Sequence, residues 1–369
     1  MRILFVIPTL VRHGAEKQLS ILAPALARVG FDVHVCALTS GGPYEATLRA
    51  AGIPVTVINK AWKFDPIAYR RLKSRIVSLK PDIVQTFLFA ANSYGRAAAL
   101  SAGVKRVFGS ERCVDPWKQW HELAVDRYLA KRSEAVVVNS HGVQEFYTRR
   151  GIPSEKVRII PNGIGPVTPS NITREALLKE LGLPTGTRLI GAVNRLWPQK
   201  RVKDLIWAAD LLKVVRDDVH LVIIGDGPHR ARLQRFRDQV QIRDRVHLLG
   251  ARDDVPRLMP HFDCFWLASE YEGMSNSIME AMACRVPVVA SNIPGNCDLI
   301  SHGETGYLFP VGARADIARH TNRLLDDAAL AKRLSVAAQE RVLREFSLDR
   351  MVAAYRDLYR GSIKTTSLR

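Results

Sequence analysis

Two carboxylates, Glu272 and Glu280, flank a short polar run in front of apolar residues at helical spacing. The run consists of Ser275, Asn276 and Ser277. These are residue types preferred at a helix N-cap, so the pattern predicts a helix start. Backbone N–H groups at a helix start can bind a phosphate, and neighbouring carboxylates can accept hydrogen bonds from sugar hydroxyls. Each glutamate also follows a serine by three positions, as in a capping box, so a purely structural interpretation stays open here.

Two cations, Arg195 and Lys200, follow a predicted strand over Leu189–Val193. Guanidinium and ammonium groups at a strand end can converge on a diphosphate, although a solvated surface pair fits the spacing as well. The chain has no Gly-Lys-Ser/Thr phosphate loop, and Gly225-Asp-Gly-Pro228 lacks the third glycine of a dinucleotide fingerprint. It also has no Asp-x-Asp triplet that could hold a divalent metal against a diphosphate.

Strands and amphipathic helices alternate along the whole chain, which predicts parallel sheets of the α/β class. The strands expected in the first half are Ile3–Ile7, Asp32–Leu38, Val55–Ile58, Ile83–Thr86, Arg106–Gly109 and Ala135–Val138. Those expected in the second half are Leu189–Val193, His220–Ile224, Val246–Leu248, Cys264–Leu267, Val286–Ala290 and Gly306–Phe309. A Gly- and Pro-rich linker over 163–170 divides two Rossmann-like, doubly wound domains, 1–168 and 169–346. An amphipathic helix at about 347–360 is expected to pack back on the first domain.

Composition places the chain among globular proteins, with 47% hydrophobic and 24% charged residues in 369. No apolar run reaches the roughly 18 residues that a membrane span requires. The five cysteines are scattered and form no Cys-x-x-Cys pair, which favours a reducing compartment and argues against structural zinc.

The net charge of +18 is concentrated in the first half of the chain. Residues 1–165 hold 24 basic and 12 acidic side chains, a net charge of +12, which indicates an anionic partner. Aromatic residues lie among these cations at Trp62, Phe64, Trp117 and Trp120. The cations near them are Lys60, Lys63, Arg70, Arg71, Lys73, Arg75, Lys80, Lys118, Arg127, Lys131 and Arg132. Such a mixture fits an anionic membrane surface, and it also fits a solvated helix face with tryptophans in the core.

Several motifs occur together in an order that carries a resemblance. They are His13-Gly-Ala-Glu16, Ile160-Pro-Asn-Gly-Ile164, Asn194-Arg-Leu-Trp-Pro-Gln-Lys200, Gly225-Asp-Gly-Pro228, Glu272-x7-Glu280 and Thr305-Gly-Tyr-Leu308. Over nearly its whole length the chain resembles the retaining glycosyltransferases of family 4, which have the GT-B fold. The resemblance implies two Rossmann-like domains facing a central cleft. The first domain would bind the acceptor and the second the nucleotide sugar.

The resemblance also implies roles for single positions. Glu272 would hold hydroxyls of the donor sugar, and Glu280 the ribose of the nucleotide. Arg195 and Lys200 would neutralise the departing diphosphate, so that no metal and no further cofactor is needed.

The first loop and the helix start complete the implied phosphate site. Gly14 would bring backbone close to the phosphate, and the amides of Met274, Ser275 and Asn276 would line its other side.

Two positions depart from the family pattern. The first loop carries His13 where many members have a glycine. The region where many members carry a histidine near the donor sugar reads Gly109-Ser-Glu-Arg-Cys113, so Glu111 or Arg112 takes that place. His121 is a possible substitute, although a lone histidine on a helix is more often structural.

The expected partners are therefore a nucleotide-sugar donor and a glycan or lipid-linked acceptor, in polysaccharide or glycolipid synthesis. The enzyme is expected in the cytoplasm, peripheral on the inner face of the membrane. A sugar-nucleotide epimerase of the same fold and a basic nucleic-acid-binding protein are the alternatives. No nucleic-acid-binding module is recognisable, so nucleic acid is not an expected partner.

Overall fold

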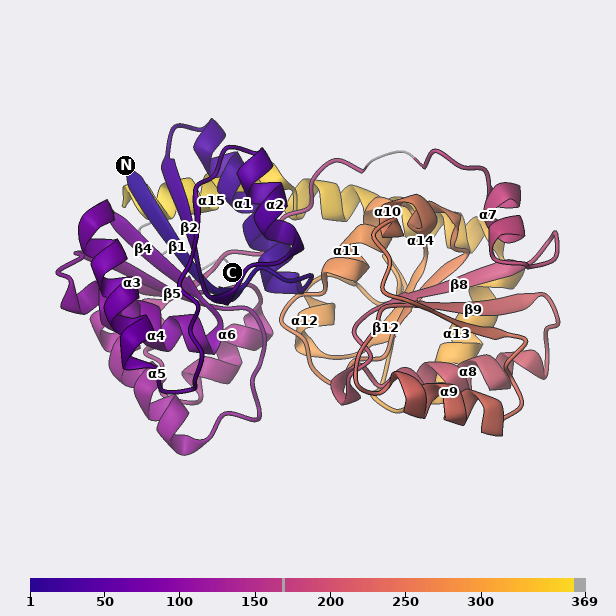
Figure 1. The fold of residues 1–369 in the computed structure, drawn as a ribbon. Helices are drawn as coiled ribbons and strands as arrows, with labels where there is room; N and C mark the ends of the chain where they lie inside the picture. Colours follow the sequence, from indigo (N-terminus) through magenta and orange to yellow (C-terminus); the bar gives the residue numbers. More distant parts are fainter. Residues whose placement is uncertain (168–169, 362–369) are drawn as a thin grey trace. The chain divides into compact units, whose positions relative to one another are not determined.

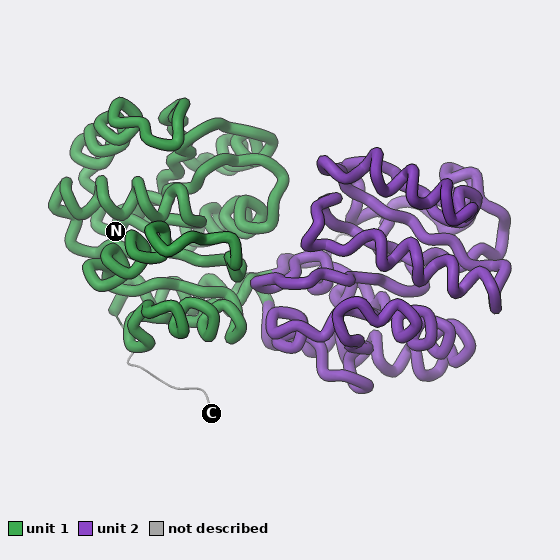
Figure 2. Tube along the Cα trace, turned by 90° about the horizontal axis from the view of Figure 1, so that it is seen from below, with its two compact units in different colours: residues 1–163, 347–369 green, residues 164–346 purple. Residues whose placement is uncertain are grey.

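In the computed structural model, which describes residues 1–167 and 170–361, the chain divides into two compact units (Figure 2). Unit 1 comprises Met1–Gly163 and the C-terminal segment from Ser347, and unit 2 comprises Ile164–Phe346. The division falls a few residues before position 168, the boundary expected from the sequence. The cause is a buried contact: the Gln18 side chain accepts a hydrogen bond from Gly163 N at 2.9 Å and donates one to its carbonyl at 3.0 Å. This contact holds the end of the segment in unit 1.

Unit 1 is built on a seven-stranded parallel sheet in the order β3-β2-β1-β4-β5-β6-β7 (Figure 1). Its strands are β1 (Arg2–Thr9), β2 (Asp32–Ser40), β3 (Val55–Val57), β4 (Ile83–Phe87), β5 (Arg106–Glu111), β6 (Ala135–Val138) and β7 (Val157–Ile159). The six strands expected in this half are confirmed to within a few residues. The strand order reverses between β1 and β4, and loops at the carboxyl ends of two such strands border a ligand crevice in open α/β sheets.

Helices cover both faces of this sheet. They are α1 (Gly14–Arg28), α2 (Pro43–Ala50), α3 (Pro66–Leu79), α4 (Leu88–Ser101), α5 (Trp120–Arg132), α6 (His141–Thr148), the 3₁₀ turn η1 (Ser154–Lys156) and α15 (Leu348–Arg360). Helices α1 and α15 share one core with the sheet, and α3 and α4 share the other. The last helix buries Met351, Tyr355 and Tyr359 in the first of these cores, because its apolar residues recur at helical spacing.

Unit 2 has a six-stranded parallel sheet in the order β10-β9-β8-β11-β12-β13. Its strands are β8 (Arg188–Val193), β9 (Val219–Ile224), β10 (Val246–Gly250), β11 (Cys264–Leu267), β12 (Val288–Ser291) and β13 (Tyr307–Phe309). Strand β12 starts two residues later than expected, because Val286 N donates to Ala281 O at 2.9 Å and still belongs to the end of a helix. The order reverses between β8 and β11.

The helices of unit 2 divide between the two faces of its sheet. They are α7 (Arg174–Glu180), η2 (Pro198–Lys200), α8 (Val202–Lys213), α9 (Arg230–Gln239), α10 (Val255–Leu258), η3 (Met259–His261), α11 (Asn276–Ala283), α12 (Pro294–Cys297), α13 (Arg314–Asp326) and α14 (Ala328–Glu345). Helices α8, α9 and α13 share one core, α7, α10 and α11 share the other, and α14 contributes residues to both. The loops after β8 and β11 therefore lie side by side at the carboxyl edge, where the sheet reverses its order.

Candidate functional site

Two loops meet at the edge of the unit 2 sheet where β8 and β11 end. The backbone N–H of Glu270 donates to the carbonyl of Gln199 at 2.8 Å. The Lys200 ammonium group pairs with Glu272 Oε1, which also accepts a hydrogen bond from the Ser269 hydroxyl at 2.7 Å. Two residues singled out separately in the sequence thus form one site, and both side chains are largely buried.

Arg195 has a different environment from Lys200. Its guanidinium group lies over the Trp197 ring, with 5.4 Å between Cζ and the ring centroid. Among the residues described, no carboxylate lies within ion-pair distance of Arg195, whereas the Lys200 charge is compensated by Glu272. The guanidinium charge is therefore available to an incoming anion.

The loop after β8 packs against the two glycines that follow β9. A Cβ atom at Gly225 would lie 1.9 Å from the Asn194 carbonyl oxygen, and one at Gly227 would lie 2.7 Å from that of Leu196. Leu196 N also donates to Asp226 O at 3.0 Å. The two glycines of this Gly-Asp-Gly sequence are thus needed because the loops after β8 and β9 approach each other closely. The spacing of the glycines in the sequence does not predict this role.

The start of α11 decides against the capping-box interpretation of the two glutamates. The N-cap is Ser275, whose hydroxyl accepts a hydrogen bond from Ile278 N at 3.4 Å. The third helical position is therefore Ile278, whereas Glu280 lies two residues further along and Glu272 lies in the loop before the helix. Neither carboxylate occupies the position that a capping box requires, so their spacing is not explained by helix capping.

The loop between Glu272 and α11 packs against residues of β12 and α12 that sequence analysis missed. A Cβ atom at Gly295, in α12, would lie 2.1 Å from the carbonyl oxygen of Gly273. The Ser291 hydroxyl donates to Ser269 O at 2.6 Å, and the Asn296 amide donates to Ser291 O at 2.9 Å. A Pro-Gly pair closely after a predicted strand was the available signal for this support.

Within unit 1, Gly14 is the first residue of α1 and follows the loop after β1. The preceding His13 is the N-cap residue, with extended backbone, and its ring nitrogen Nδ1 lies 3.9 Å from Glu16 Oε1. The same carboxylate oxygen accepts a hydrogen bond from the Thr9 hydroxyl at 3.0 Å. The predicted glycine therefore starts a helix beside a loop held by a buried glutamate.

Glu111 and Arg112 lie at the carboxyl end of β5 and are both buried. Glu111 Oε1 accepts hydrogen bonds from the Asn92 amide at 2.9 Å and from the Lys118 ammonium group at 3.1 Å. Its Oε2 is also buried and has no hydrogen-bond partner among the described residues. Burial raises the pKa of Glu111 to about 7, against the opposing charge of Lys118.

Arg112 is held by the end of β7 and by α15 rather than by a carboxylate. Its guanidinium group donates to Asn162 Oδ1 and, at 3.4 Å, to the Tyr355 hydroxyl. Asn139 donates to the Arg112 carbonyl at 3.0 Å.

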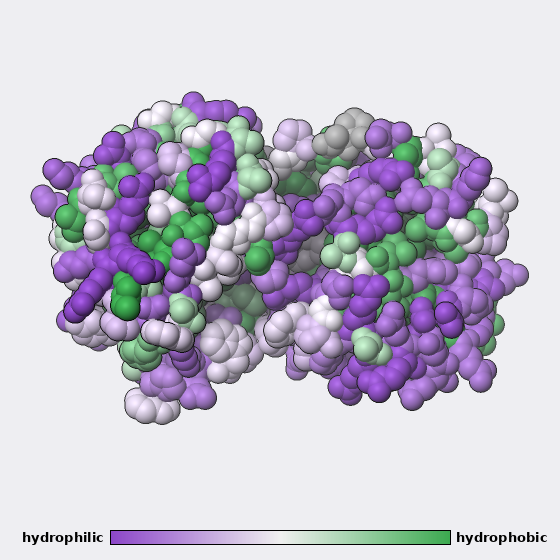
Figure 3. Space-filling view, in the orientation of Figure 1, coloured by the Kyte–Doolittle hydropathy of each residue, from purple (hydrophilic) through white to green (hydrophobic). Residues whose placement is uncertain are grey.

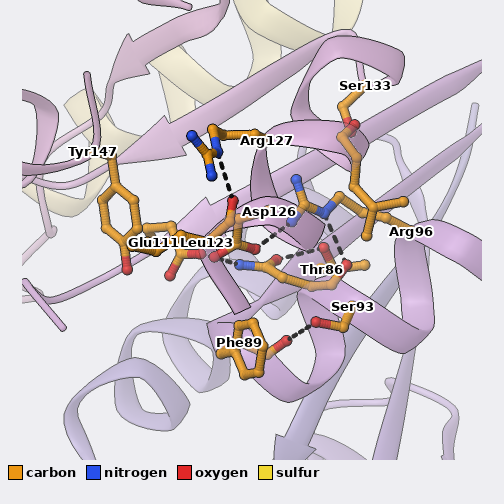
Figure 4. Close-up of polar contacts among 12 residues, drawn as sticks. Thr86, Phe89, Ser93, Arg96, Glu111, Leu123, Asp126, Arg127, Ser133 and Tyr147 are labelled. Atoms are coloured by element: carbon orange, nitrogen blue, oxygen red, sulfur yellow. Dashed lines mark hydrogen bonds and ion pairs between the residues drawn. The ribbon is translucent and has the colours of Figure 1, made fainter. Parts of the chain in front are cut away.

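A buried charged cluster extends from Glu111 beneath α5. Lys118 lies within 3.5 Å of three carboxylates, and it donates at 2.8 Å to both Asp126 and the Tyr147 hydroxyl. Asp126 also accepts a hydrogen bond from Arg96 at 2.8 Å, and Figure 4 shows these two side chains pointing toward one another. The sequence interpretation of Lys118 as part of a basic surface is wrong, because this side chain is completely buried.

His121 does not belong to the buried cluster. It lies on the exposed side of α5, and its ring contacts that of Trp120 edge to face with centroids 5.7 Å apart.

Within residues 1–167 and 170–361 no group of three His, Cys, Asp or Glu side chains is placed to hold a metal ion.

Two family models match consecutive parts of the chain. Residues 12–167 match the model described as Glycosyltransferase Family 4, and residues 173–341 match the model described as Glycosyl transferases group 1. The expected glycosyltransferase family is thereby confirmed for both units.

Curated relatives point in the same direction. The chain is 27% identical over 349 residues to UDP-Gal:alpha-D-GlcNAc-diphosphoundecaprenol alpha-1,3-galactosyltransferase of Escherichia coli, with 89% of each protein covered. It is 29% identical over 234 residues to N-acetyl-alpha-D-glucosaminyl L-malate synthase of Bacillus anthracis, a match that covers 63% of this chain and 61% of that protein.

Solved structures confirm the fold. The crystal structure of Anabaena HepE in complex with UDP and glucose has a TM-score of 0.89 at 22% identity, covering 98% of this chain and all of that one. A sucrose-phosphate synthase from Thermosynechococcus elongatus has a TM-score of 0.82 at 19% identity, with 98% and 99% covered. Both support the α/β, two-domain GT-B fold expected from the sequence.

Proposed function

The chain belongs to the group 1 glycosyltransferases of the GT-B fold, and from this we propose that it transfers a sugar from a nucleoside diphosphate sugar to a glycan or lipid-linked acceptor. The observation that carries this proposal is the meeting of Lys200 and Glu272, beside Arg195 and the start of α11. A diphosphate needs cations and backbone N–H groups, and a sugar needs a carboxylate acceptor within a few ångströms of them. The loops after β8 and β11 supply both.

We propose a division of labour within this site. Arg195 and Lys200 stabilise the charge that develops on the departing diphosphate, and Glu272 accepts hydrogen bonds from donor-sugar hydroxyls. The start of α11, with Met274, Ser275 and Asn276, presents backbone N–H groups to the phosphates. Glu280 binds the ribose, and in unit 1 Gly14 allows its loop to approach the donor.

The reaction that we propose retains the anomeric configuration. The acceptor hydroxyl oxygen forms a bond to the anomeric carbon on the face from which the diphosphate departs, and the departing phosphate oxygen takes the acceptor proton. The enzyme then contributes orientation of two substrates and stabilisation of the leaving-group charge. Because Arg195 and Lys200 stabilise the leaving-group charge, we propose that no divalent metal is required and that activity survives a chelator.

Two of these proteins support a uridine donor, and one of them supports a membrane-linked acceptor. HepE has been solved with UDP and glucose, and the Escherichia coli relative is named for a UDP-galactose donor and a diphosphoundecaprenol acceptor. For this chain we therefore propose a UDP-sugar and an acceptor of cell-surface polysaccharide or glycolipid synthesis.

We propose that the protein binds the cytoplasmic side of a membrane peripherally, and an aromatic surface of unit 1 supports the membrane binding. Phe64 is 88% exposed and Trp120 is 78% exposed, and Trp62 and Trp117 are more than half exposed. The alternative that these tryptophans belong to the core is therefore wrong.

The two loops that carry Trp62, Phe64 and Trp117 contact the same helix, α4. The Tyr94 hydroxyl donates to Lys63 O at 2.9 Å, and the Phe89 and Trp117 rings meet edge to face at 6.2 Å. Lys63 also lies 3.7 Å from Glu122, at the start of α5. Aromatic side chains beside lysines suit an anionic lipid surface. Within residues 1–167 and 170–361, none of the helices combines the length and the hydropathy of a membrane span.

The experiment that tests the proposal is thermal unfolding with a panel of nucleoside diphosphates, followed by donor turnover. A ligand that binds only the folded state raises the melting temperature, and we expect UDP to do so more than GDP or ADP. The corresponding sugar nucleotides are then incubated with a membrane extract as the source of acceptor. No shift with any nucleotide and no release of nucleoside diphosphate would overturn the proposal, and interconversion of the sugar without transfer would indicate an epimerase.

A further inference from the structure

A cavity of about 520 Å³ lies in unit 2, on the face of the sheet covered by α8, α9 and α13. Its cationic lining residues are Arg201, Lys203, Arg232, Arg235 and Arg314. The Trp197 ring and the Phe236 ring contribute aromatic walls, and His229 lies at the start of α9. The volume is in the range of pockets that bind small ligands.

The cavity has a large excess of positive charge. Its single carboxylate, Asp204, is buried and already shared by two guanidinium groups, Arg201 at 2.6 Å and Arg314 at 2.8 Å. Lys203 Nζ lies 4.3 Å from the centroid of the Phe236 ring. Lys203, Arg232 and Arg235 have no ion-pair partner among the residues that the structure describes. Several like charges around one hollow repel each other, and an anion in that hollow would relieve the repulsion.

The neighbouring backbone adds to this field. The first residues of α8 and α13 and the N-cap of α9 line the cavity, and helix starts carry partial positive charge. Figure 3 shows strongly hydrophilic residues over the lower right of the view, where Figure 1 places α8 and α9.

The cavity is separate from the site between β8 and β11. Lys200 is turned toward Glu272, whereas the next residue, Arg201, lines the cavity and pairs with Asp204. Arg201 has a φ of 46°, a left-handed conformation that is uncommon for a residue with a side chain, and this turn redirects the chain between the two sites. Trp197 lines the cavity while Arg195 lies over its ring, so segment 195–201 borders both sites.

We propose that this cavity binds a small soluble anion that carries two or more phosphate groups. Its cations come from three helices, α8 with its N-cap, α9 and α13, and this arrangement suits a compact ligand with several charges better than a single carboxylate. Because segment 195–201 borders both sites, the bound anion changes the affinity of the donor site by linkage through that segment. The binding itself does not depend on the proposed function, whereas this second effect rests on it.

The test uses inorganic tripolyphosphate and isothermal titration calorimetry on the full chain. The background is the double variant Arg195→Ala/Lys200→Ala, which removes the cations of the donor site so that binding there does not mask the cavity. We expect one molecule of tripolyphosphate to bind per chain in this background. Adding Arg232→Ala and Arg235→Ala should weaken that binding about tenfold or more, since the anion then loses two cationic hydrogen-bond donors.

The control is a second pair of exposed cations, Lys332→Ala/Arg333→Ala in α14, which removes the same charge away from the cavity. Unchanged binding in this control, with loss in the α9 variant, supports the cavity. Equal weakening by both pairs would show only a general effect of net charge and would overturn the assignment, as would the absence of binding in the starting background.

Linkage to the donor site is measured separately, as the change in UDP affinity of the otherwise unaltered chain on adding tripolyphosphate. A change that disappears in Arg232→Ala/Arg235→Ala supports the coupling. Competition between the two ligands that persists in this variant would overturn it. If no nucleotide binds at all while tripolyphosphate still binds, the proposed function is wrong, but the assignment of an anion-binding site to the cavity is still supported.

Discussion

The ammonium group of Lys200 is paired with the carboxylate of Glu272, although 72 positions separate them in the chain. The pairing follows from sheet topology, since β8 and β11 are neighbours and the loops after them share one edge. In this arrangement the lysine is held in position by the residue assigned to the donor sugar. An arriving diphosphate then competes with a carboxylate for Lys200, whereas Arg195 meets no such competition.

Loss of Arg195 or Lys200 should slow the chemical step. We expect Arg195→Ala and Lys200→Ala to lower kcat about 10²-fold or more, because each removes charge stabilisation needed most when the diphosphate departs. The measurement is steady-state turnover of the donor, with Lys179→Ala, an exposed lysine of α7, as the matched control. Near-normal kcat/KM in both variants would show that these cations do not act on the leaving group.

Substitution of Glu272 and of Glu280 should affect nucleotide binding differently. Glu272→Gln should reduce transfer from the sugar donor but not weaken free nucleoside diphosphate, since it also releases Lys200 from its partner. Glu280→Gln should weaken the nucleoside diphosphate as well, because its carboxylate is assigned to the ribose. Calorimetric titration with UDP checks this, and equal losses of UDP affinity in the two variants would contradict the division.

Glu111 should make stability depend on pH. Its pKa is raised from 4.5 to about 7 in the folded state, so the folded chain holds a proton that the unfolded chain releases between these values. The stabilisation is fully present below about pH 4.5 and is lost as the pH rises through about 7. Relative to Glu111→Gln, the wild type should therefore lose about 1 to 3 kcal/mol between pH 5 and pH 8.

Calorimetric unfolding at several pH values measures this difference. Glu155→Gln, an exposed glutamate of the same unit, is the control and should follow the wild type. A difference between wild type and Glu111→Gln that is constant from pH 5 to pH 8 would contradict the assignment.

Membrane binding should depend on both charge and salt. Arg70 and Arg71 are exposed on α3, and reversal of both to Glu should reduce co-sedimentation with anionic vesicles, since each cation near such a surface contributes about 1 kcal/mol. Arg75, on the same helix, is not part of this charge-reversal variant because its Nε atom is buried. Binding by the wild type should also weaken toward 1 M salt, where the Debye length is roughly 3 Å.

The control for the vesicle experiment is Lys332→Glu/Arg333→Glu in unit 2. Trp62→Ala/Phe64→Ala tests the aromatic contribution and should weaken binding at every salt concentration. Equal sedimentation with neutral and anionic vesicles would leave the basic surface as ordinary solvated surface.

The fold could be predicted from sequence because strand and helix periods are strong local signals. Twelve strands were located to within a few residues, whereas the short edge strand β7 was not expected, and the last helix was recognised from its apolar spacing. The pairing of Lys200 with Glu272 could only be expected through the family resemblance, since contacts across a sheet depend on strand order. The burial of Lys118 could not be predicted, because three carboxylates that come together only in the fold compensate its charge. The support from Gly295 depends likewise on a close backbone approach that no local pattern reports.

The central claim, sugar transfer from a nucleoside diphosphate donor, is tested most directly by following a radiolabelled sugar from donor into product. Wild type and Arg195→Ala/Lys200→Ala are incubated with UDP-sugars, each labelled in the sugar, and with extracted membrane lipids and glycans. We predict that one donor releases UDP and that its label enters the lipid or glycan fraction at least about 10²-fold faster with the wild type. Equal incorporation by wild type and variant, or none from any nucleotide sugar with a folded enzyme, would contradict the account.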